Sequence, residues 1–177
     1  MTENSKNNRR SGICYLWAII LTATCFAALA ANADAEQTTT VSIRVMMSGP
    51  RPTMLPAGDD ENHYVGVGNR EGEAVFSDGK KAKYSNVYML DWHRDGSSDS
   101  WGYTKMVFND GSWLFLKWNA AVVGIDENGP VSKGKGTILK GTGPYEGIKG
   151  TAEFTSRNLK SPPGDSESSA VLTYTLP

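Results

Sequence analysis

The segment Asp91-Trp92-His93-Arg94-Asp95 gathers two carboxylates, an imidazole, a guanidinium and an indole within five positions. A histidine near neutral pH can accept a proton, and a neighbouring carboxylate can orient its ring. His93 with Asp91 or Asp95 is therefore a candidate general-base pair. In a strand, positions 91 and 93 share one face, while 92 and 94 take the other. The alternative interpretation is a solvated strand end, where charged side chains reach water.

Residues that could bind a metal are sparse. His63 and His93 are the only histidines, and the two cysteines, Cys14 and Cys25, lie close to the N-terminus. Because no ligand pair has the close spacing typical of zinc sites, we predict no metal. Asp59-Asp60-Glu61 could offer carboxylates to calcium, but it lacks the interleaved Asp/Asn-Gly pattern of a dedicated loop. A flexible acidic turn is the alternative.

Other catalytic motifs are missing from the sequence. No serine stands in a Gly-x-Ser-x-Gly context. No helical pattern follows the two glycine-rich tripeptides, Gly66-Val67-Gly68 and Gly134-Lys135-Gly136. They therefore do not predict a phosphate site at a helix N-terminus. Besides His93, two isolated residues, Glu153 and Lys117, are candidates for acid–base chemistry. We predict no cofactor, and the sequence leaves open whether the protein is an enzyme.

Residues 1–35 have the features of a secretory signal peptide. Lys6, Arg9 and Arg10 form a basic start, residues 13–30 are almost uninterrupted apolar sequence, and residues 31–35 offer small-x-small cleavage sites. We predict cleavage after Ala35, with Ala33 as the alternative site, and export to the periplasm or the medium. The other interpretation is an uncleaved membrane anchor, because the apolar run approaches membrane-spanning length.

The predicted mature chain, residues 36–177, is long enough for one domain with a substantial core. It has no cysteine, so its stability must come from packing rather than from disulfides. Three of the 18 basic and two of the 19 acidic residues precede residue 36, which leaves 15 against 17 and a net charge of −2. This balance does not favour nucleic acid or, after cleavage, a membrane as partner.

A hydrophobic period of two runs through nearly the whole mature chain, and no segment keeps a helical period. Val41, Ile43 and Val45, for example, share one strand face, and Asn109-Asp110-Gly111 predicts a hairpin turn. We predict a turn at 68–71 between two short strands. The predicted strands are 39–47, 64–67, 72–76, 82–92, 101–108, 112–121, 133–140, 150–157 and 168–176.

Eight or nine short strands at this spacing predict an all-β sandwich or barrel. Closure is favoured because it removes the sticky edges that apolar runs such as 113–116 would otherwise expose. We therefore predict an all-β fold, a closed antiparallel β-barrel of about eight strands with short connecting loops.

A glycine-rich segment, residues 141–150, marks a tight corner between two of these strands. Gly141, Gly143, Gly147 and Gly150 surround Tyr145, and glycine allows positive φ or a very close approach to a neighbour. The run Gly-Thr-Gly-Pro-Tyr-Glu-Gly-Ile-Lys-Gly resembles the Gly-Thr-Gly-aromatic-x-Gly-Ile-x-Gly corner of the allene oxide cyclase and dirigent-like barrel superfamily. The likeness covers roughly residues 64–157. The order of turns and strands in this range is similar to that in exported bacterial members of the superfamily.

This resemblance implies a shaped pocket rather than strong acid–base groups. The family's cyclase folds an unstable epoxide inside an apolar cavity, and its dirigent proteins steer radical coupling. A buried glutamate that holds a water is associated with activity in the cyclase. Glu153 follows the glycine-rich corner, but no motif matches it to that glutamate. The resemblance therefore predicts the fold and leaves the activity open.

The strand around residues 113–119 is apolar on both faces, so either face could be buried. One interpretation is a barrel whose outside another subunit covers. Another is a mostly apolar pocket into which Lys117 and Asn119 point, and a third is a solidly packed core. The candidate pocket residues are Trp101, Tyr103, Phe115 and Trp118.

Taken together, the sequence predicts an exported small barrel that binds a small apolar molecule or assembles as a homo-oligomer. One alternative is an isomerase or cyclase whose cavity holds a hydrophobic substrate in a productive shape. The other is a structural barrel that only associates with itself.

Overall fold

The computed structural model describes residues 38–159 and 165–177, which are mostly strands. The predicted signal peptide lies outside the described residues. Within them, η2 (Gly143–Tyr145) is a single 3-10 turn, and no helix is long and apolar enough to cross a membrane. The strands are β1 (Thr39–Ser48), β2 (Thr53–Pro56), β3 (Tyr64–Phe76), β4 (Lys81–Trp92), β5 (Ser98–Phe108), β6 (Trp113–Asp126), β7 (Gly129–Gly141), β8 (Lys149–Asn158) and β9 (Ser166–Thr175).

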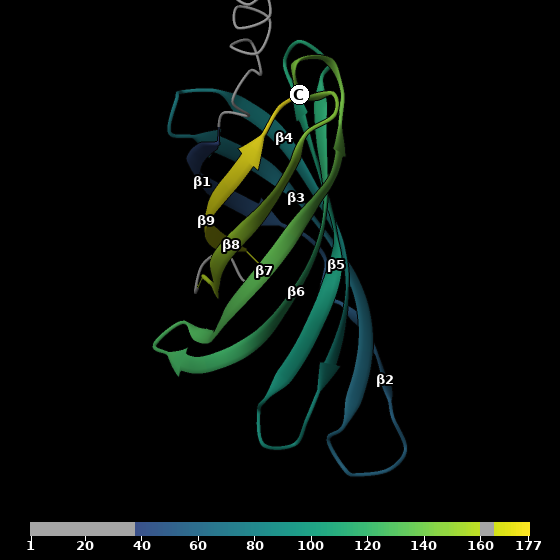
Figure 1. Cartoon of the computed structure of the whole chain (residues 1–177). Helices are drawn as coiled ribbons and strands as arrows, with labels where there is room; N and C mark the ends of the chain where they lie inside the picture. The colour runs from purple at the N-terminus through teal and green to yellow at the C-terminus, as the bar shows by residue number, and fades with distance from the viewer. Residues whose placement is uncertain (1–37, 160–164) are drawn as a thin grey trace, which may run out of the picture. The chain divides into compact units, whose positions relative to one another are not determined.

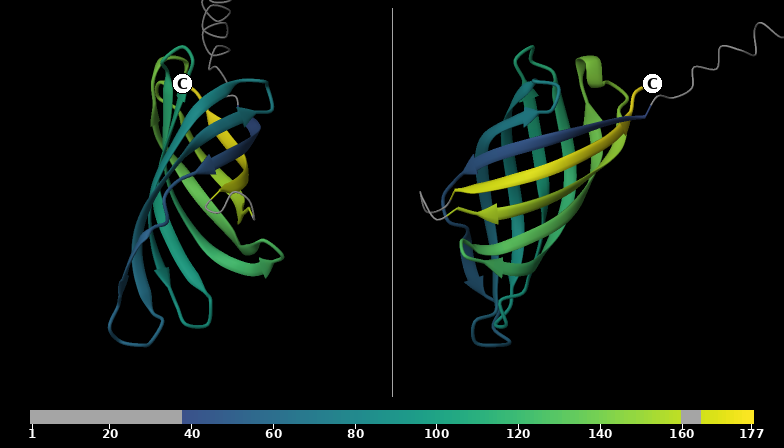
Figure 2. Two further views of the ribbon diagram at one scale, coloured as in Figure 1. Left: turned by 180° about the vertical axis from the view of Figure 1, so that it is seen from behind. Right: turned by 90° about the vertical axis from the view of Figure 1, so that its left-hand side faces the viewer.

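Eight of these strands close into an antiparallel barrel (Figure 1). The order is β1-β9-β8-β7-β6-β5-β4-β3, and pairing of β1 with β3 completes the ring. The short strand β2 is extra: it pairs with residues 64–67 of β3, whereas β1 pairs with residues 71–76. The strands slant around the barrel (Figure 2), as closure of a sheet requires. The predicted closed β-barrel is confirmed.

Strand β3 is one continuous element, so the predicted hairpin with its turn at 68–71 is wrong. The glycines that suggested a turn instead make room for a large side chain. A Cβ atom on Gly68 would lie 2.5 Å from Cζ of Tyr88, its cross-strand partner. A glycine inside a strand often marks such a close approach. The structure also adds β2 between β1 and β3, where no strand was predicted.

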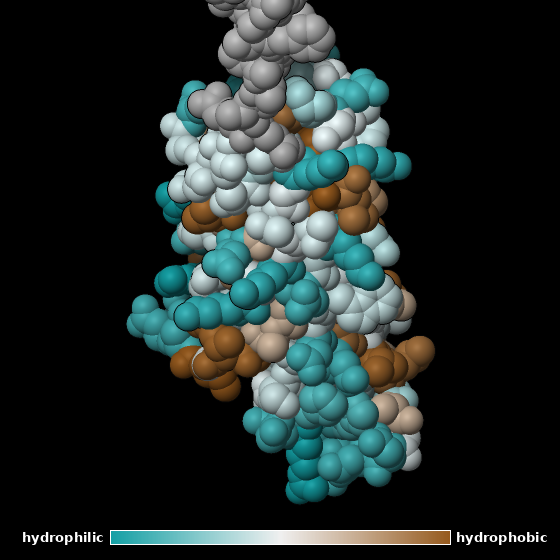
Figure 3. Space-filling model, in the orientation of Figure 1, coloured by the Kyte–Doolittle hydropathy of each residue, from teal (hydrophilic) through white to brown (hydrophobic). Residues whose placement is uncertain are grey.

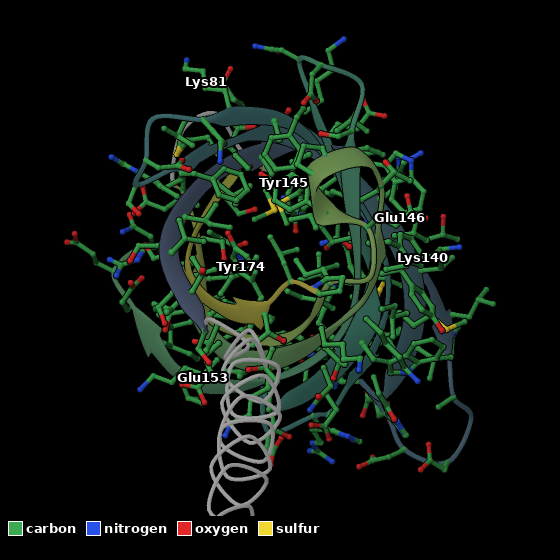
Figure 4. The ribbon with its side chains drawn as sticks, turned by 45° about the horizontal axis from the view of Figure 1, so that its top comes forward. Lys81, Lys140, Tyr145, Glu146, Glu153 and Tyr174 are labelled. Carbon is green, nitrogen blue, oxygen red and sulfur yellow. The ribbon has the colours of Figure 1, made fainter. Side chains whose placement is uncertain are left out.

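The hydrophobic core fills one end of the barrel. The rings of Phe76 and Phe108 lie 5.2 Å apart between centroids, and Tyr145 stacks on Phe108 at 4.9 Å. Figure 4 shows Tyr145 and Tyr174 inside the ring of strands. The other core residues are Val41, Ile43, Val45, Met47, Ala74, Ala82, Met106, Leu114, Leu116, Ile138, Ile148, Ala152 and Leu172.

The glycine-rich corner forms the turn that carries Tyr145 into this core. Gly143 and Gly147 have φ angles of +61° and +74°. A Cβ atom on Gly141 would lie 2.6 Å from Cβ of Tyr145, and one on Gly150 would lie 2.3 Å from the carbonyl oxygen of Thr173. The corner therefore needs glycine at all four positions, and it closes this end of the barrel.

Candidate ligand-binding site

The other half of the barrel contains a cavity of about 520 Å³. It extends from the edge of the core, at Met106 and Leu116, toward the end that carries the β4–β5 and β6–β7 turns. Arg51, Arg70 and Arg157 contribute to the lining toward that end. Among the described residues that line the cavity there is no Asp, Glu, His or Lys. A volume of this size suits a small molecule.

A short chain of hydrogen bonds lies on the wall formed by β4 and β5. Nδ2 of Asn86 donates to Oη of Tyr84 at 3.1 Å, and that oxygen lies 3.3 Å from Oγ1 of Thr104. Burial raises the pKa of the Tyr84 phenol, so the group keeps its proton at neutral pH. Nearby, Nη1 of Arg70 donates to Oγ of Ser166 at 3.2 Å. These groups can form hydrogen bonds to a ligand, but none of them is a ready base.

Two buried polar atoms in the cavity lining have no hydrogen-bond partner among the described residues. They are Oδ1 of Asn86, an acceptor, and Nε1 of Trp118, a donor. The Trp118 ring packs edge-on against Phe154, with centroids 5.7 Å apart. Buried polar groups are nearly always paired in native proteins, so two unpaired ones in one cavity suggest that a ligand or ordered water completes them.

Of the four predicted pocket residues, the structure places Trp118 in the cavity lining and the other three on the outer surface. Strand β6 buries Leu114 and Leu116, and strict alternation therefore points Phe115 outward. Phe115 stacks there on Tyr103, with centroids 5.6 Å apart. Trp101 is 47% exposed. Because both faces of these strands are aromatic, the sequence could not distinguish inside from outside.

The three predicted catalytic candidates do not meet at one place. Lys117 and Glu153 both line a shallow outer hollow beside Trp101, and Oε1 of Glu153 lies 3.3 Å from Nζ of Lys135. Figure 4 shows Glu153 outside the ring of strands. Lys117 therefore does not point into the lumen. His93 lies elsewhere, after the end of β4, and none of the three lines the central cavity.

The sequence reasoning missed Tyr84 and Asn86, which carry the polar part of the cavity. The sequence analysis placed Asp91 and His93 on one strand face, and Asp91 lies with Val87 and Met89 on the outer face of β4. The signal for the inner face was present, because Ala82, Tyr84, Asn86 and Tyr88 also alternate.

The fold also brings together the two histidines that lie far apart in the sequence. Nε2 of His63 lies 2.7 Å from Oδ1 of Asp91, and the rings of His63 and His93 are 4.7 Å apart between centroids. Hydrogen bonds with Asp91 and Asp59 raise the pKa of His63. This cluster lies on the outer face of the barrel wall, since Leu90 and Trp92 on the same strand line the cavity.

No family model matches the chain, and no curated protein does. Two solved structures of pterocarpan synthase dirigent proteins are similar to it. GePTS1 has 18% sequence identity and a TM-score of 0.45, over 80% of this chain and 87% of that chain. PsPTS1 has 17% identity and a TM-score of 0.46, over 80% of this chain and 96% of that one. The barrel itself is established by the strand pairings described above.

Proposed function

We propose that this protein is an exported barrel that binds a small, mainly apolar molecule in its lumen. Two buried polar atoms support the proposal: Oδ1 of Asn86 and Nε1 of Trp118 have no hydrogen-bond partner among the described residues. Both residues line a largely apolar cavity. Ligand sites typically combine an apolar wall with a few such polar groups. One hydroxyl group on the ligand could accept from the indole, and another could donate to the amide oxygen.

The distribution of side chains along the cavity suggests how such a molecule lies. Its apolar body would pack toward Met106, Leu116 and Leu172, and its polar end would face the arginine-containing end of the cavity. A lining without carboxylate or imidazole favours binding over acid–base catalysis. The isomerase or cyclase alternative would have to act through cavity shape and hydrogen bonds alone.

Isothermal titration calorimetry with matched long-chain alcohols, carboxylic acids and hydrocarbons tests this proposal. We expect saturable binding of one molecule per barrel, with the alcohol or acid tighter than the hydrocarbon. Trp118→Phe keeps the ring but removes the N–H donor, so it should weaken the alcohol several-fold and spare the hydrocarbon. Trp101→Phe on the outer surface is the control. Absence of saturable binding across the panel, or equal losses in both variants, contradicts the proposal.

Export is the part of the proposal that rests on the N-terminal sequence. Intact-mass measurement of the protein purified from its host should give a chain that starts at Glu36, or at Asp34 if the alternative site is used. A chain that retains residues 1–33 contradicts export with cleavage.

Self-association is a second candidate function, and one outer surface favours it. Val67, Val87, Met89 and Trp101 are 43% to 57% exposed. Val67 pairs with Met89, which pairs with Trp101, so these side chains form a continuous apolar surface across β3, β4 and β5. Figure 3 shows further apolar residues between polar ones on the face that it draws. A second copy of the chain could cover the β3–β5 surface.

A further inference from the structure

Three side chains with metal-binding atoms converge on the outer surface near the end of the barrel that carries the β4–β5 turn. They come from two parts of the chain that are distant in sequence. His63 directly precedes β3, whereas Asp91 lies at the end of β4 and His93 directly follows that strand. Nε2 of His93 lies 3.9 Å from the Asp91 oxygen that Nε2 of His63 approaches at 2.7 Å. All three ligand atoms lie within 4.8 Å of one another.

The backbone on both sides of the cluster is held in place. The carbonyl of His63 accepts a hydrogen bond from the Ala57 N–H at 2.9 Å, which closes the loop between β2 and β3. Asp91 belongs to β4, where it pairs with Val65. The N–H of His93 donates to the Ser97 carbonyl at 2.9 Å, which closes the β4–β5 turn. The three side chains therefore start from ordered positions.

Asp59 determines which nitrogen of His63 faces the cluster. Oδ1 of Asp59 lies 2.5 Å from Nδ1 of His63, so this carboxylate accepts the Nδ1–H. In the neutral ring, Nε2 then carries a lone pair directed at Asp91, which is also an acceptor. Two acceptors at 2.7 Å require a proton between them, or side chains that move apart to admit a metal ion. A carboxylate that holds the far nitrogen of a histidine is a typical second partner in metal sites.

We propose that His63, Asp91 and His93 bind a divalent transition-metal ion, for which zinc is the representative. Two imidazoles and one carboxylate suit zinc and its neighbours, whereas calcium and magnesium prefer oxygen ligands alone. Ligand atoms about 2.0–2.1 Å from a tetrahedral zinc stand roughly 3.4 Å apart. The observed separations of 2.7 and 3.9 Å lie on either side of that value, so small side-chain rotations suffice.

Access and charge also fit a metal ion. The side chains of His63, Asp91 and His93 are 17%, 46% and 41% exposed, so an ion can enter from solvent and keep a water as its fourth ligand. With neutral imidazoles, Asp59 and Asp91 make the cluster doubly negative. Arg94, which follows His93 in the sequence, faces Asp60 at 3.8 Å.

Bound metal would connect the loop that ends at His63 to the end of β4. Trp92 lies between Asp91 and His93 in the sequence and points the other way, into the lining of the cavity. The site would thereby fix a residue in the lining of the cavity. Trp92 also provides a readout, because its fluorescence should change when the metal binds.

The test is calorimetric titration of EDTA-treated, dialysed protein with zinc chloride at neutral pH. We expect one zinc per chain, and affinity reduced at least tenfold in both His63→Gln and His93→Gln. Asp59→Asn should weaken binding about 10-fold to 100-fold without changing the stoichiometry. Asp110→Asn is the matched control, because its carboxylate accepts from Ser112 in the same way, in the turn at the opposite end of β5. Circular dichroism verifies that each variant is folded.

Cobalt(II) provides a second measurement, since its visible absorption reports coordination directly. A tetrahedral band should form with the wild-type protein and be lost in His93→Gln. No zinc binding to the wild-type protein overturns the proposal and leaves a proton as the bridging cation. Zinc binding that both histidine variants retain also overturns it, because the ion would then lie on other side chains. Neither result bears on ligand binding in the lumen.

Discussion

Asn86 illustrates a conflict between stability and ligand binding at the level of one residue. It is 8% exposed, and its amide oxygen has no partner among the described residues. Asn86→Leu removes an unpaired buried acceptor and one hydrogen bond to Tyr84, so we expect the free energy of unfolding to rise or to fall by less than about 1 kcal/mol. The same change should weaken an alcohol ligand several-fold.

Urea denaturation and calorimetry measure the two effects of Asn86→Leu separately. Asn119→Leu, at an exposed position of β6, is the control and should leave ligand affinity unchanged. A large loss of stability together with unchanged affinity would show that Asn86 serves the fold and not a ligand.

Two hairpin turns carry an aspartate whose ionisation should stabilise the protein. Asp95 and Asp110 each accept a hydrogen bond from the hydroxyl of the serine two residues later, at 2.6 Å, and one from its backbone N–H. These bonds, the hydroxyl first, lower the pKa of both carboxyl groups. A lowered pKa contributes stability above the ordinary aspartate value, and this contribution is lost as the pH falls through the folded-state value.

Thermal unfolding as a function of pH tests the role of these two carboxylates. The Asp95→Asn/Asp110→Asn variant should be less stable than wild type at neutral pH, and the difference should shrink in acid. Glu127→Gln/Glu146→Gln removes two exposed carboxylates and serves as the control for net charge. A difference from wild type that stays constant down to strongly acidic pH contradicts the prediction.

What the sequence could not reveal at this scale was the direction of side chains. Trp101 and Trp118 have the same chemistry. One points outward and the other inward only because of which residues of β5 and β6 alternate toward the lumen. His63 and His93 meet because β3 and β4 pair with Tyr64 opposite Trp92, a register that their separation in the sequence does not indicate. The candidate site was therefore predictable in kind, as an apolar lumen, but not in its polar residues.

At the scale of elements, Gly68 lets β3 and β4 pair closely inside the barrel. A Cβ atom there would overlap the ring of Tyr88, which is buried. We expect Gly68→Ala to lower the free energy of unfolding by about 1–3 kcal/mol, because the ring must move within a packed wall. Urea denaturation measures this loss.

Gly124 provides the matched control on another strand. A Cβ atom at this position would meet nothing within 4 Å. Gly124→Ala should therefore leave stability within about 0.5 kcal/mol or raise it slightly. Equal losses in the two variants would mean that strand glycines matter here through backbone freedom and not through the Tyr88 contact.

Most strands were predictable because their residues alternate and their turns have strong sequence signals. The hairpin at Asn109-Asp110-Gly111 is an example, with Gly111 at a φ of +84°. The hairpin predicted within β3 was wrong for a related reason. Gly66, Gly68 and Gly72 have the composition of a turn, but in the structure they allow close packing of neighbouring atoms. Local composition cannot distinguish a glycine that bends the chain from one that accommodates a neighbouring ring.

At the scale of the whole molecule, closure of the barrel divides it into a filled half and a hollow half. The glycine-rich corner, Tyr145 and the stacked phenylalanines fill one end. The other half retains a cavity, and the candidate metal cluster lies on the outer surface near the β4–β5 turn. Closure was predictable from the need to protect apolar strand edges, whereas the extent of the cavity depends on packing that only the structure gives.

Closure also leaves an outer surface on which the barrel can associate with another copy. The surface formed by Val67, Val87, Met89 and Trp101 is apolar and continuous across three strands. If it is an interface, light scattering at micromolar concentration should give an oligomer for wild type and a monomer for Met89→Asp, because a buried charge without a partner is strongly unfavourable. Val171→Asp is the control: Val171 has the same 43% exposure as Met89 but lies on β9, away from this surface. A wild-type monomer, or dissociation by both variants, would leave the apolar surface without a role in assembly.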